Sequence, residues 1–498
     1  EHVNESILRQ YQCMKARALK ENILRKLGRV KEAEELHKES LKIDPLYDRQ
    51  PEKINHNTLL ELVIDLYEAG DYAQGITLAE KWVEQQNVSR QEDIYPLVYY
   101  YIAYGYQNLH RKENTEQANC YMTMYVTLGE NAAADGCFPH RTEDYIVLKS
   151  LAEEYHLAMA YYYLGCLLYD RRVYDESIED YEESILRSPD FPTVHRNLAL
   201  AYYNVKKLPQ RAYEEMEKAF ALDETDARVY LELDQLKKRL NVAVKERWSD
   251  MEKHFDLVES RDDLYLEYVT LLNTLGEPEK ALGLIKARKF HQWEGGEGKV
   301  AAQYLTALYQ LAKAAVEKED YAEAKELLLR AVGEYPHNLG EGKLESGQEN
   351  NLYYLLGLVQ EKLGEAKDAF ESLTRACCGE SEPVGMMYYN DQPPEMIYYQ
   401  GLAYRMLGEE EQAVRRFQKL VDYGREHIRD DVKIDYFAVS LPDLLIFEEN
   451  LNERNRKHCL FMMSLGLKGL GRIDEAEKCA EELLAMDNAH QEIRVHDL

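Results

Sequence analysis

The sequence has few of the features that mark nucleic-acid binders, membrane proteins and metalloenzymes. Its 91 acidic residues outnumber 61 Lys and Arg, for a net charge of −30, so we expect no nucleic-acid or anionic-membrane partner, since both need a positive surface. No run of about 18 apolar residues is present, which predicts no membrane span. Its 8 Cys form no C-x-x-C pair, and no histidine pair has a third ligand nearby. We therefore predict no metal site and no cofactor.

Linkers and low-complexity segments are also missing. No Ser/Gly-rich stretch divides the chain, and no credible strand pattern occurs. Most cysteines lie among apolar neighbours, where a free thiol behaves as a small hydrophobe, and this predicts a reducing, cytoplasmic location. The first residue is Glu1 rather than Met, so we expect a piece of a longer protein, in which any targeting signal would lie upstream.

What is present is a repeated pair of amphipathic helices. In the stretch 161–169, Tyr161, Leu164, Gly165 and Leu168 share one helical face. A facing stripe follows at Ser177, Tyr181 and Ser184, and Pro189 ends the second helix. Small residues where two helices cross let their backbones approach. This unit of about 34 residues resembles the tetratricopeptide repeat (TPR).

The same pattern recurs along the chain, with one degenerate copy near 227–258. We predict an all-α protein, a right-handed α-solenoid of about eleven TPR-like helix pairs. Residues 1–290 form the N-terminal half of this superhelix. Residues 301–498 form the C-terminal half, in which longer loops separate the helices.

Tyrosine is abundant: 39 residues against 10 Phe and 3 Trp. In a TPR-like pair, the residue after the first-helix packing position points into the groove, as do those four and seven places later. Tyrosines there favour a stacking surface for a peptide or glycan, or else bond neighbouring helices inside a tight superhelix. The groove tyrosines selected are Tyr162, Tyr169, Tyr203, Tyr309, Tyr354 and Tyr398.

Four insertions interrupt the later repeats, at 290–300, 335–344, 386–395 and 433–443. Insertions at equivalent points of a solenoid project from one edge, so we expect them to gather. Aromatic rings beside carboxylates and amides suit a sugar, and paired carboxylates can hydrolyse glycosides. The alternative is that they are ordinary turns. The candidate ligand-binding residues are Trp293, Glu294, Glu297, Asn338, Glu341, Tyr389, Asn390, Asp391, Asp435 and Tyr436, of which Glu294, Glu297, Asp391 and Asp435 are weak catalytic candidates.

Several loop strings carry a second resemblance, over about residues 58–498. They look like the C-terminal TPR region of a family of large bacterial proteins whose N-terminal domain resembles galactose-mutarotase-like β-sandwiches. The resemblance implies a carbohydrate-related protein of several domains and assigns no catalytic residue. Besides the four insertions, the strings that carry it are Tyr95-Pro-Leu-Val-Tyr-Tyr-Tyr101, Cys137-Phe-Pro139, Phe191-Pro-Thr-Val-His-Arg-Asn197 and Leu231-Glu-Leu-Asp-Gln-Leu236.

Three functions are consistent with this sequence. The first is a scaffold, without catalytic activity of its own, that binds its own N-terminal domain or a partner protein. The second is a glycan-binding or glycoside-hydrolase site that the edge loops share with the N-terminal domain. The third is a regulatory TPR protein that binds a peptide in a groove that the loops leave open; strong self-association that plugs the groove would count against it.

Overall fold

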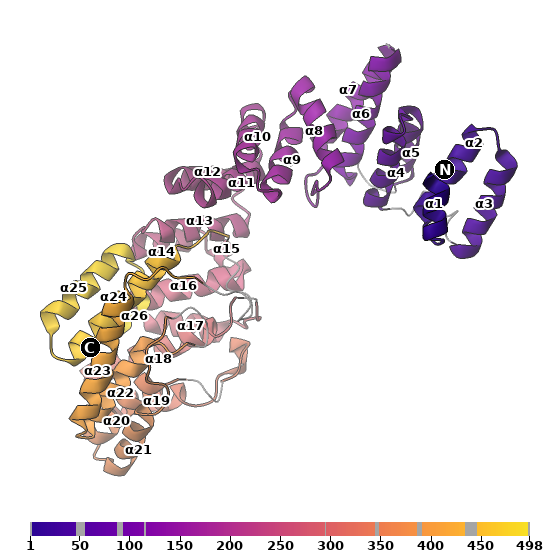
Figure 1. Ribbon diagram of the computed structural model, residues 1–498. Helices are drawn as coiled ribbons and strands as arrows, with labels where there is room; N and C mark the ends of the chain where they lie inside the picture. Colours follow the sequence, from indigo (N-terminus) through magenta and orange to yellow (C-terminus); the bar gives the residue numbers. More distant parts are fainter. Residues whose placement is uncertain are drawn as a thin grey trace. The chain divides into compact units, whose positions relative to one another are not determined.

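The computed structural model describes residues 2–45, 55–86, 93–113, 116–293, 295–343, 348–385, 391–433 and 446–496 (Figure 1). Within these ranges the chain consists of helices and their connections, without a strand, and this confirms the predicted all-α solenoid. None of these helices is long and apolar enough to cross a bilayer. The right-handed sense and the number of helix pairs stay predictions.

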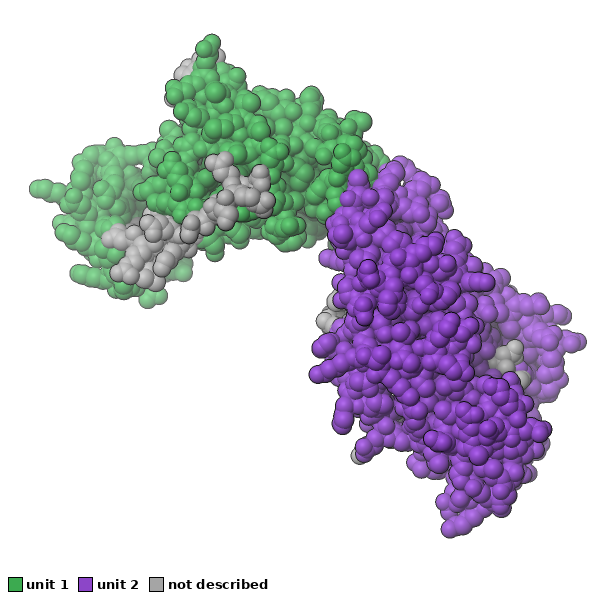
Figure 2. Space-filling model, turned by 180° about the vertical axis from the view of Figure 1, so that it is seen from behind, with its two compact units in different colours: residues 1–198 green, residues 199–498 purple. Residues whose placement is uncertain are grey.

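The chain divides into two compact units, residues 1–198 and residues 199–498 (Figure 2). The boundary falls within α11 (Pro192–Asn204). The two predicted halves, residues 1–290 and 301–498, were separated by the longer loops of the second half and not by compactness. That division stays a prediction.

Unit 1 is built from helices that pack on their neighbours in sequence. They are α1 (His2–Arg9), α2 (Met14–Lys26), α3 (Val30–Ile43), α4 (His56–Glu68), α5 (Tyr72–Gln85), α6 (Pro96–Glu113), α7 (Glu116–Asn131), α8 (Thr142–Tyr155), α9 (Ala158–Asp170), α10 (Tyr174–Arg187) and the first part of α11.

Unit 2 continues in the same way and ends in a short helix. Its elements are the rest of α11, α12 (Pro209–Leu222), α13 (Ala227–Arg239), α14 (Val244–Lys253), α15 (Phe255–Ser260), α16 (Asp262–Thr274), α17 (Pro278–Ala287), α18 (Lys299–Glu317), α19 (Tyr321–Ala331), η3 (His337–Leu339), α20 (Asn350–Lys362), α21 (Ala366–Ala376), α22 (Pro394–Met406), α23 (Glu410–His427), α24 (Leu451–Gly469), α25 (Ile473–Met486) and α26 (Gln491–Val495).

Helices form antiparallel pairs, and the first helix of one pair also contacts the first helix of the next. In unit 2 this second contact joins α16 to α18, α18 to α20, α20 to α22 and α22 to α24. We call the surface formed by the first helices of unit 2 its inner face, and it includes residues 199–204 of α11 together with α13, α16, α18, α20, α22 and α24.

The pair α9–α10 has the packing that the sequence predicts. Ser177 is fully buried and donates its hydroxyl to the carbonyl of Gly165 at 2.7 Å. A Cβ atom on Gly165 would lie 2.5 Å from Cδ1 of Tyr181, a distance that no side chain tolerates. The ring of Tyr181 therefore rests directly on the α9 backbone, which explains why this position is glycine.

The stretch predicted as a degenerate repeat departs from the pattern for a polar reason. Two short helices, α14 and α15, follow α13, and the side chain of Arg247 on α14 is fully buried. Arg247 donates two hydrogen bonds to Asp234, at 3.0 and 2.6 Å, and one to Glu267 at 2.7 Å. Burying a guanidinium requires such partners. A hydrogen-bonded charge cluster replaces the small-residue crossing here.

The helix crossings lead to a first prediction, at Gly401 on α22. A Cβ atom there would lie 2.5 Å from Cε1 of Phe417, a ring that is fully buried and also lies against Gly469. Because Phe417 has no space to move into, Gly401→Ala should lower the free energy of unfolding by about 1–3 kcal/mol, as overpacked cores do. Chemical unfolding followed by circular dichroism measures this.

Gly283 on α17 is the matched control, because a Cβ atom there meets nothing within 4 Å. Gly283→Ala should raise the free energy of unfolding by about 0.5–1 kcal/mol through helix propensity alone. Equal effects of the two substitutions would contradict the role given to Gly401.

Candidate peptide-binding surface

Two of the four predicted loops come together. The backbone N–H of Phe290 donates to the carbonyl of Asn338 at 2.9 Å, which joins 290–300 to 335–344. Trp293, Glu297 and Glu341 line one small cavity between them. Its volume is about 30 Å³, enough for one or two water molecules.

The polar groups of these loops hold the loops themselves. Asn338 donates to the carbonyls of Ile285 and Arg288 at 2.8 and 2.9 Å. Glu341 accepts from the backbone N–H groups of Gly298 and Ala301, both at 2.8 Å, at the N-terminus of α18.

The ring of Trp293 lies against the Gly296 backbone, where a Cβ atom would come within 2.3 Å of it. Only its other side is left for a ligand. Trp293, Asn338 and Glu341, which were predicted to bind a ligand, therefore make contacts within the protein.

The remaining candidates from the loops do not line this small cavity, or lie outside the residues that the structure describes. Asp391 is close enough to Tyr423 and His458 to act on both through its charge, and it is not among the described residues that line the small cavity. The catalytic role of the carboxylates stays a prediction. Glu294, Tyr389, Asn390, Asp435 and Tyr436 lie outside the described residues.

The predicted groove tyrosines divide into buried and partly exposed side chains. Tyr162, Tyr309 and Tyr398 are buried, whereas Tyr169, Tyr203 and Tyr354 are partly exposed. The ring of Tyr398 packs on Phe417 of α23, with 5.7 Å between centroids, and so faces the second helix of its own pair. The adjacent Tyr399, which was not among the predicted groove tyrosines, lies on the inner face instead, where its hydroxyl contacts Tyr309 and His496.

Two of these tyrosines contact distant segments of the same chain. The Tyr203 ring meets Phe447 edge-on, with centroids 5.1 Å apart. The Tyr309 ring lies 5.6 Å from that of His496. The inner face of unit 2 thus carries polypeptide from the C-terminal part of the chain.

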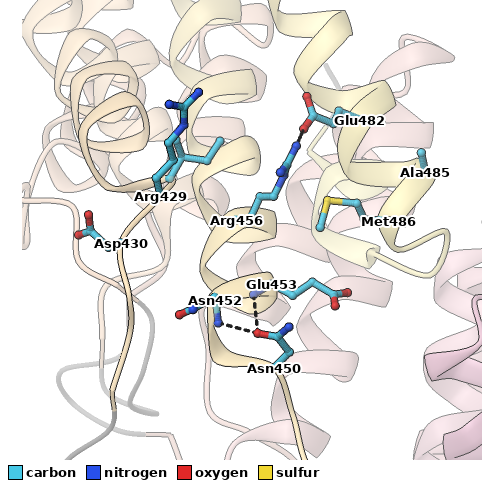
Figure 3. Close-up of a pocket in the computed structure, with 10 residues that line it drawn as sticks. Arg429, Asp430, Asn450, Asn452, Glu453, Arg456, Glu482, Ala485 and Met486 are labelled. Atoms are coloured by element: carbon cyan, nitrogen blue, oxygen red, sulfur yellow. Dashed lines mark hydrogen bonds and ion pairs between the residues drawn. The ribbon is translucent and has the colours of Figure 1, made fainter. Parts of the chain in front are cut away.

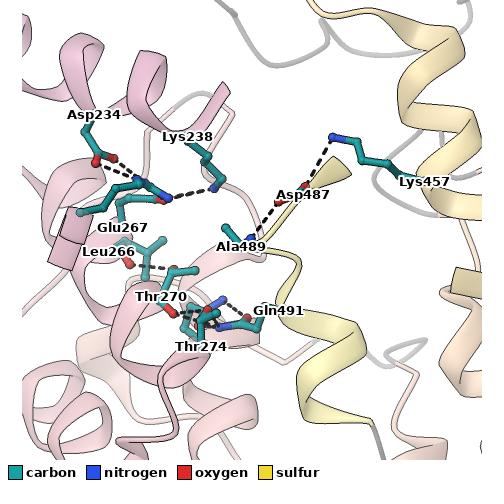
Figure 4. Close-up of polar contacts among 12 residues, drawn as sticks. Asp234, Lys238, Leu266, Glu267, Thr270, Thr274, Lys457, Asp487, Ala489 and Gln491 are labelled. Atoms are coloured by element: carbon teal, nitrogen blue, oxygen red, sulfur yellow. Dashed lines mark hydrogen bonds and ion pairs between the residues drawn. The ribbon is translucent and has the colours of Figure 1, made fainter. Parts of the chain in front are cut away.

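The longest such contact involves residues 485–496, which we call the C-terminal segment (Figure 4). Asn488 donates its backbone N–H to the Asn241 side-chain oxygen at 2.8 Å, and its own amide donates to the Asn241 carbonyl at 2.6 Å. In turn, the Asn241 amide donates to the carbonyl of Ala485 at 3.0 Å. These bonds attach the segment to the end of α13.

Further along, the C-terminal segment crosses α16 and α18. The side-chain amide of Gln491 donates to the carbonyl of Thr270 at 3.1 Å, and the Gln303 amide donates to the Gln491 side-chain oxygen at 2.8 Å (Figure 4). Lys313 donates to the carbonyl of Val495 at 3.0 Å. Scaffold side chains therefore bind the main chain and one amide of the segment, while Ile493 and Val495 are buried.

The end of the segment reaches α22. Nδ1 of His496 lies 3.1 Å from the Tyr399 hydroxyl, which in turn lies 2.7 Å from the Tyr309 hydroxyl. Burial lowers the pKa of His496 to about 3, and the charge of Lys313 acts in the same direction. The imidazole is therefore neutral at physiological pH.

A larger open groove of about 730 Å³ lies at the ends of α23, α24 and α25 (Figure 3). Several of its polar groups are engaged locally: Asn450 accepts from the N–H groups of Asn452 and Glu453, at 3.1 and 3.2 Å, and Arg456 pairs with Glu482. Cations and anions both line it, so it favours no single class of charged ligand. Across the described ranges, no three His, Cys, Asp or Glu residues cluster as a metal site would require.

The loop contacts predict a structural role for Glu341. Glu341→Ala removes the acceptor for two N–H groups at the start of α18, and should lower the free energy of unfolding by about 1–2 kcal/mol. Glu297→Ala, at an exposed position beside the same cavity, should change it by less than about 0.5 kcal/mol. Urea unfolding compares the two, and equal losses would contradict the capping role.

The buried imidazole predicts a dependence on pH. A histidine whose folded-state pKa is lowered costs stability as pH falls below its unfolded value of about 6.5, because only the unfolded chain binds the proton. Below pH 6.5, wild type should lose about 1.4 kcal/mol more per pH unit than His496→Gln. His337→Gln, at an exposed position of the same unit, should match wild type. Unfolding curves at pH 7.5, 6.5 and 5.5 measure this, and parallel profiles for wild type and His496→Gln would refute it.

Comparison with known proteins agrees with the repeat pattern. Two family models, both described as tetratricopeptide repeat, match residues 309–383 and 395–423. Among solved structures, the chain is similar to yeast Tom70 (10% identity, 97% of this chain and 94% of that chain, TM-score 0.30). It is also similar to YrrB, described as a TPR protein with an unusual peptide-binding site (18%, 49% and 96%, TM-score 0.19). A third is a human IFIT1 dimer with PPP-AAAA (12%, 85% and 89%, TM-score 0.28). Within residues 309–383 and 395–423 the chain therefore carries tetratricopeptide repeats.

Proposed function

We propose that this chain is a scaffold, without catalytic activity of its own, that binds peptide or protein segments on the inner face of unit 2. The observation that carries the proposal is the C-terminal segment, which lies across α13, α16, α18 and α22. Asn241, Gln303 and Lys313 each bond to it.

The contacts are of a kind that a foreign peptide can reproduce. Asn241 and Lys313 bind main-chain atoms of the segment, which every peptide carries. Apolar side chains at Ile493 and Val495 add buried area, each worth about 1.5–3 kcal/mol when fully buried. A partner segment with an amide and two branched aliphatic residues on a short helical turn, as in α26, would fit the same surface.

An attached segment also competes with a partner. A tethered chain end is present at an effective concentration of the order of millimolar, so a partner reaches the inner face only by binding more tightly or by changing the segment. This favours a regulated scaffold over a permanently open peptide groove.

The finer expectations from the sequence remain proposals. The partner is a separate protein or the expected N-terminal domain. The loops are better explained as structural than as a sugar site, because the cavity at Trp293 is small and Asn338 and Glu341 are hydrogen-bonded within the protein. The carbohydrate relation therefore rests on the sequence resemblance alone.

The test supplies the C-terminal segment from residue 487 onward in trans; Ala485, the acceptor of the Asn241 amide, stays on the shortened chain. A chain that ends at Met486 should bind a labelled peptide of residues 487–498, measured by fluorescence anisotropy, whereas the full chain should bind it at least tenfold more weakly. Gln303→Ala in the shortened chain should weaken binding, because it removes the donor to Gln491.

Circular dichroism gives a second readout. If the shortened chain loses helical signal, the peptide should restore it, since a ligand that binds only the folded state stabilises that state. A peptide of the same composition in scrambled order is the control. The proposed function would be refuted if the shortened chain showed no peptide binding and no recovery of helical signal.

A further inference from the structure

We propose that the pocket around Phe447, between α11 and α13, is a binding site for a partner peptide that carries an aromatic residue followed by an acidic one. The chain's own Phe447 and Glu448 occupy it. This inference rests on the proposed peptide-binding function and assigns a second site on the inner face and the chemical class of its ligand.

One asparagine brackets the main chain on both sides of the aromatic residue. The Asn204 amide donates to the carbonyl of Ile446 at 2.9 Å, and its side-chain oxygen accepts from the backbone N–H of Glu448 at 2.9 Å. A side-chain amide supplies one donor and one acceptor in a fixed plane. Asn204 therefore recognises the peptide main chain and places the residue between those two bonds in the pocket.

The pocket itself is aromatic and cationic. Phe447 is fully buried, and its ring meets Tyr203 edge-on at 5.1 Å. Cζ of Arg239 lies 5.7 Å from the centre of the Phe447 ring, and Arg239 also donates to the Phe447 carbonyl at 3.0 Å. A guanidinium over a ring face and an edge-on ring pair both favour an aromatic occupant over an aliphatic one.

The next position selects charge. Nζ of Lys207 lies 2.5 Å from the Glu448 carboxylate, and about 64% and 63% of these two side chains are exposed. The ion pair therefore lies at the rim of the pocket, where a partner in solution can reach it. An exposed ion pair contributes little affinity, but Lys207 disfavours a positively charged residue at the position of Glu448.

The occupying segment is replaceable. Residues 446–449 lie outside the helices, and no backbone–backbone hydrogen bond joins them to another described residue. They are held by the contacts of Asn204, Tyr203, Arg239 and Lys207 described above, and the Glu449 carboxylate also accepts from Arg454 at 3.4 Å. A peptide with the same groups can reproduce every one of these contacts, and Arg239 and Lys207 complement an acidic one.

The experiment uses the full chain carrying Phe447→Ala, which empties the pocket, and a labelled peptide of residues 446–451. Fluorescence anisotropy should give a dissociation constant at least tenfold lower for this variant than for wild type, in which the attached segment competes. Adding Asn204→Ala to the variant should weaken binding at least tenfold. Adding Asn131→Ala, at an exposed position on α7, should leave binding unchanged.

Two peptide changes test the class of ligand. Alanine in place of the phenylalanine should abolish binding to the Phe447→Ala chain. A charge reversal tests the acidic position in a chain that keeps Phe447: Lys207→Glu should bind the peptide with lysine at the position of Glu448 more tightly than the original peptide. Because Lys207 is exposed, this variant is expected to fold as wild type does.

The proposal is overturned if Phe447→Ala binds no more tightly than wild type, or if Asn204→Ala has no effect. If Phe447→Ala loses helical signal, the charge reversal decides. The proposal is then overturned if Lys207→Glu still binds the original peptide more tightly than the peptide with lysine at the position of Glu448. A wild-type dimer that dissociates on Phe447→Ala, seen by light scattering, would assign the pocket to a second copy and overturn the partner peptide. Binding of the 487–498 peptide without binding of the 446–451 peptide would refute this site alone; failure of both would also refute the proposed function.

Discussion

In this solenoid a large aromatic side chain of one helix lies directly on a glycine of its neighbour. Tyr67 covers Gly75 and Gly105, Tyr181 covers Gly165, and Phe417 lies between Gly401 and Gly469. A helix pair has too little apolar surface to be stable alone, so each pair must stack on the next. The close approach at these glycines sets the crossing of the helices, and with it the positions of the side chains on the inner face.

The inner face of unit 2 is filled from within the same chain. Its polar side chains bind main-chain groups at two places, Asn204 around Phe447 and Asn241 around Asn488. At both places one side-chain amide supplies a donor and an acceptor to the main chain of the segment. Such groups are suited to polypeptide.

Much of the architecture could be predicted from spacing alone, because Gly165, Ser177 and Tyr181 share a helical period and small size. The site could be predicted only in part. Register selected Tyr309 and Tyr203, which contact the self-bound segments, but it selected Tyr398 where Tyr399 faces inward. A shift of one residue turns a helix position by about 100°, and no local pattern separates two adjacent tyrosines. Asn338 and Glu341 have the chemistry of ligand-binding groups, yet they cap and brace their own loops.

The helical class, the repeat and the crossings follow from periodicity and residue size, which are local properties of the sequence. The contacts of the inner face depend instead on how the helix pairs stack. Asn204 and Ile446 are separated by 242 positions, and Asn241 and Asn488 by 247; no pattern within one repeat relates them. Stacking of the helix pairs brings these residues together, and the polar side chains of the inner face thereby contact the C-terminal part of the same chain.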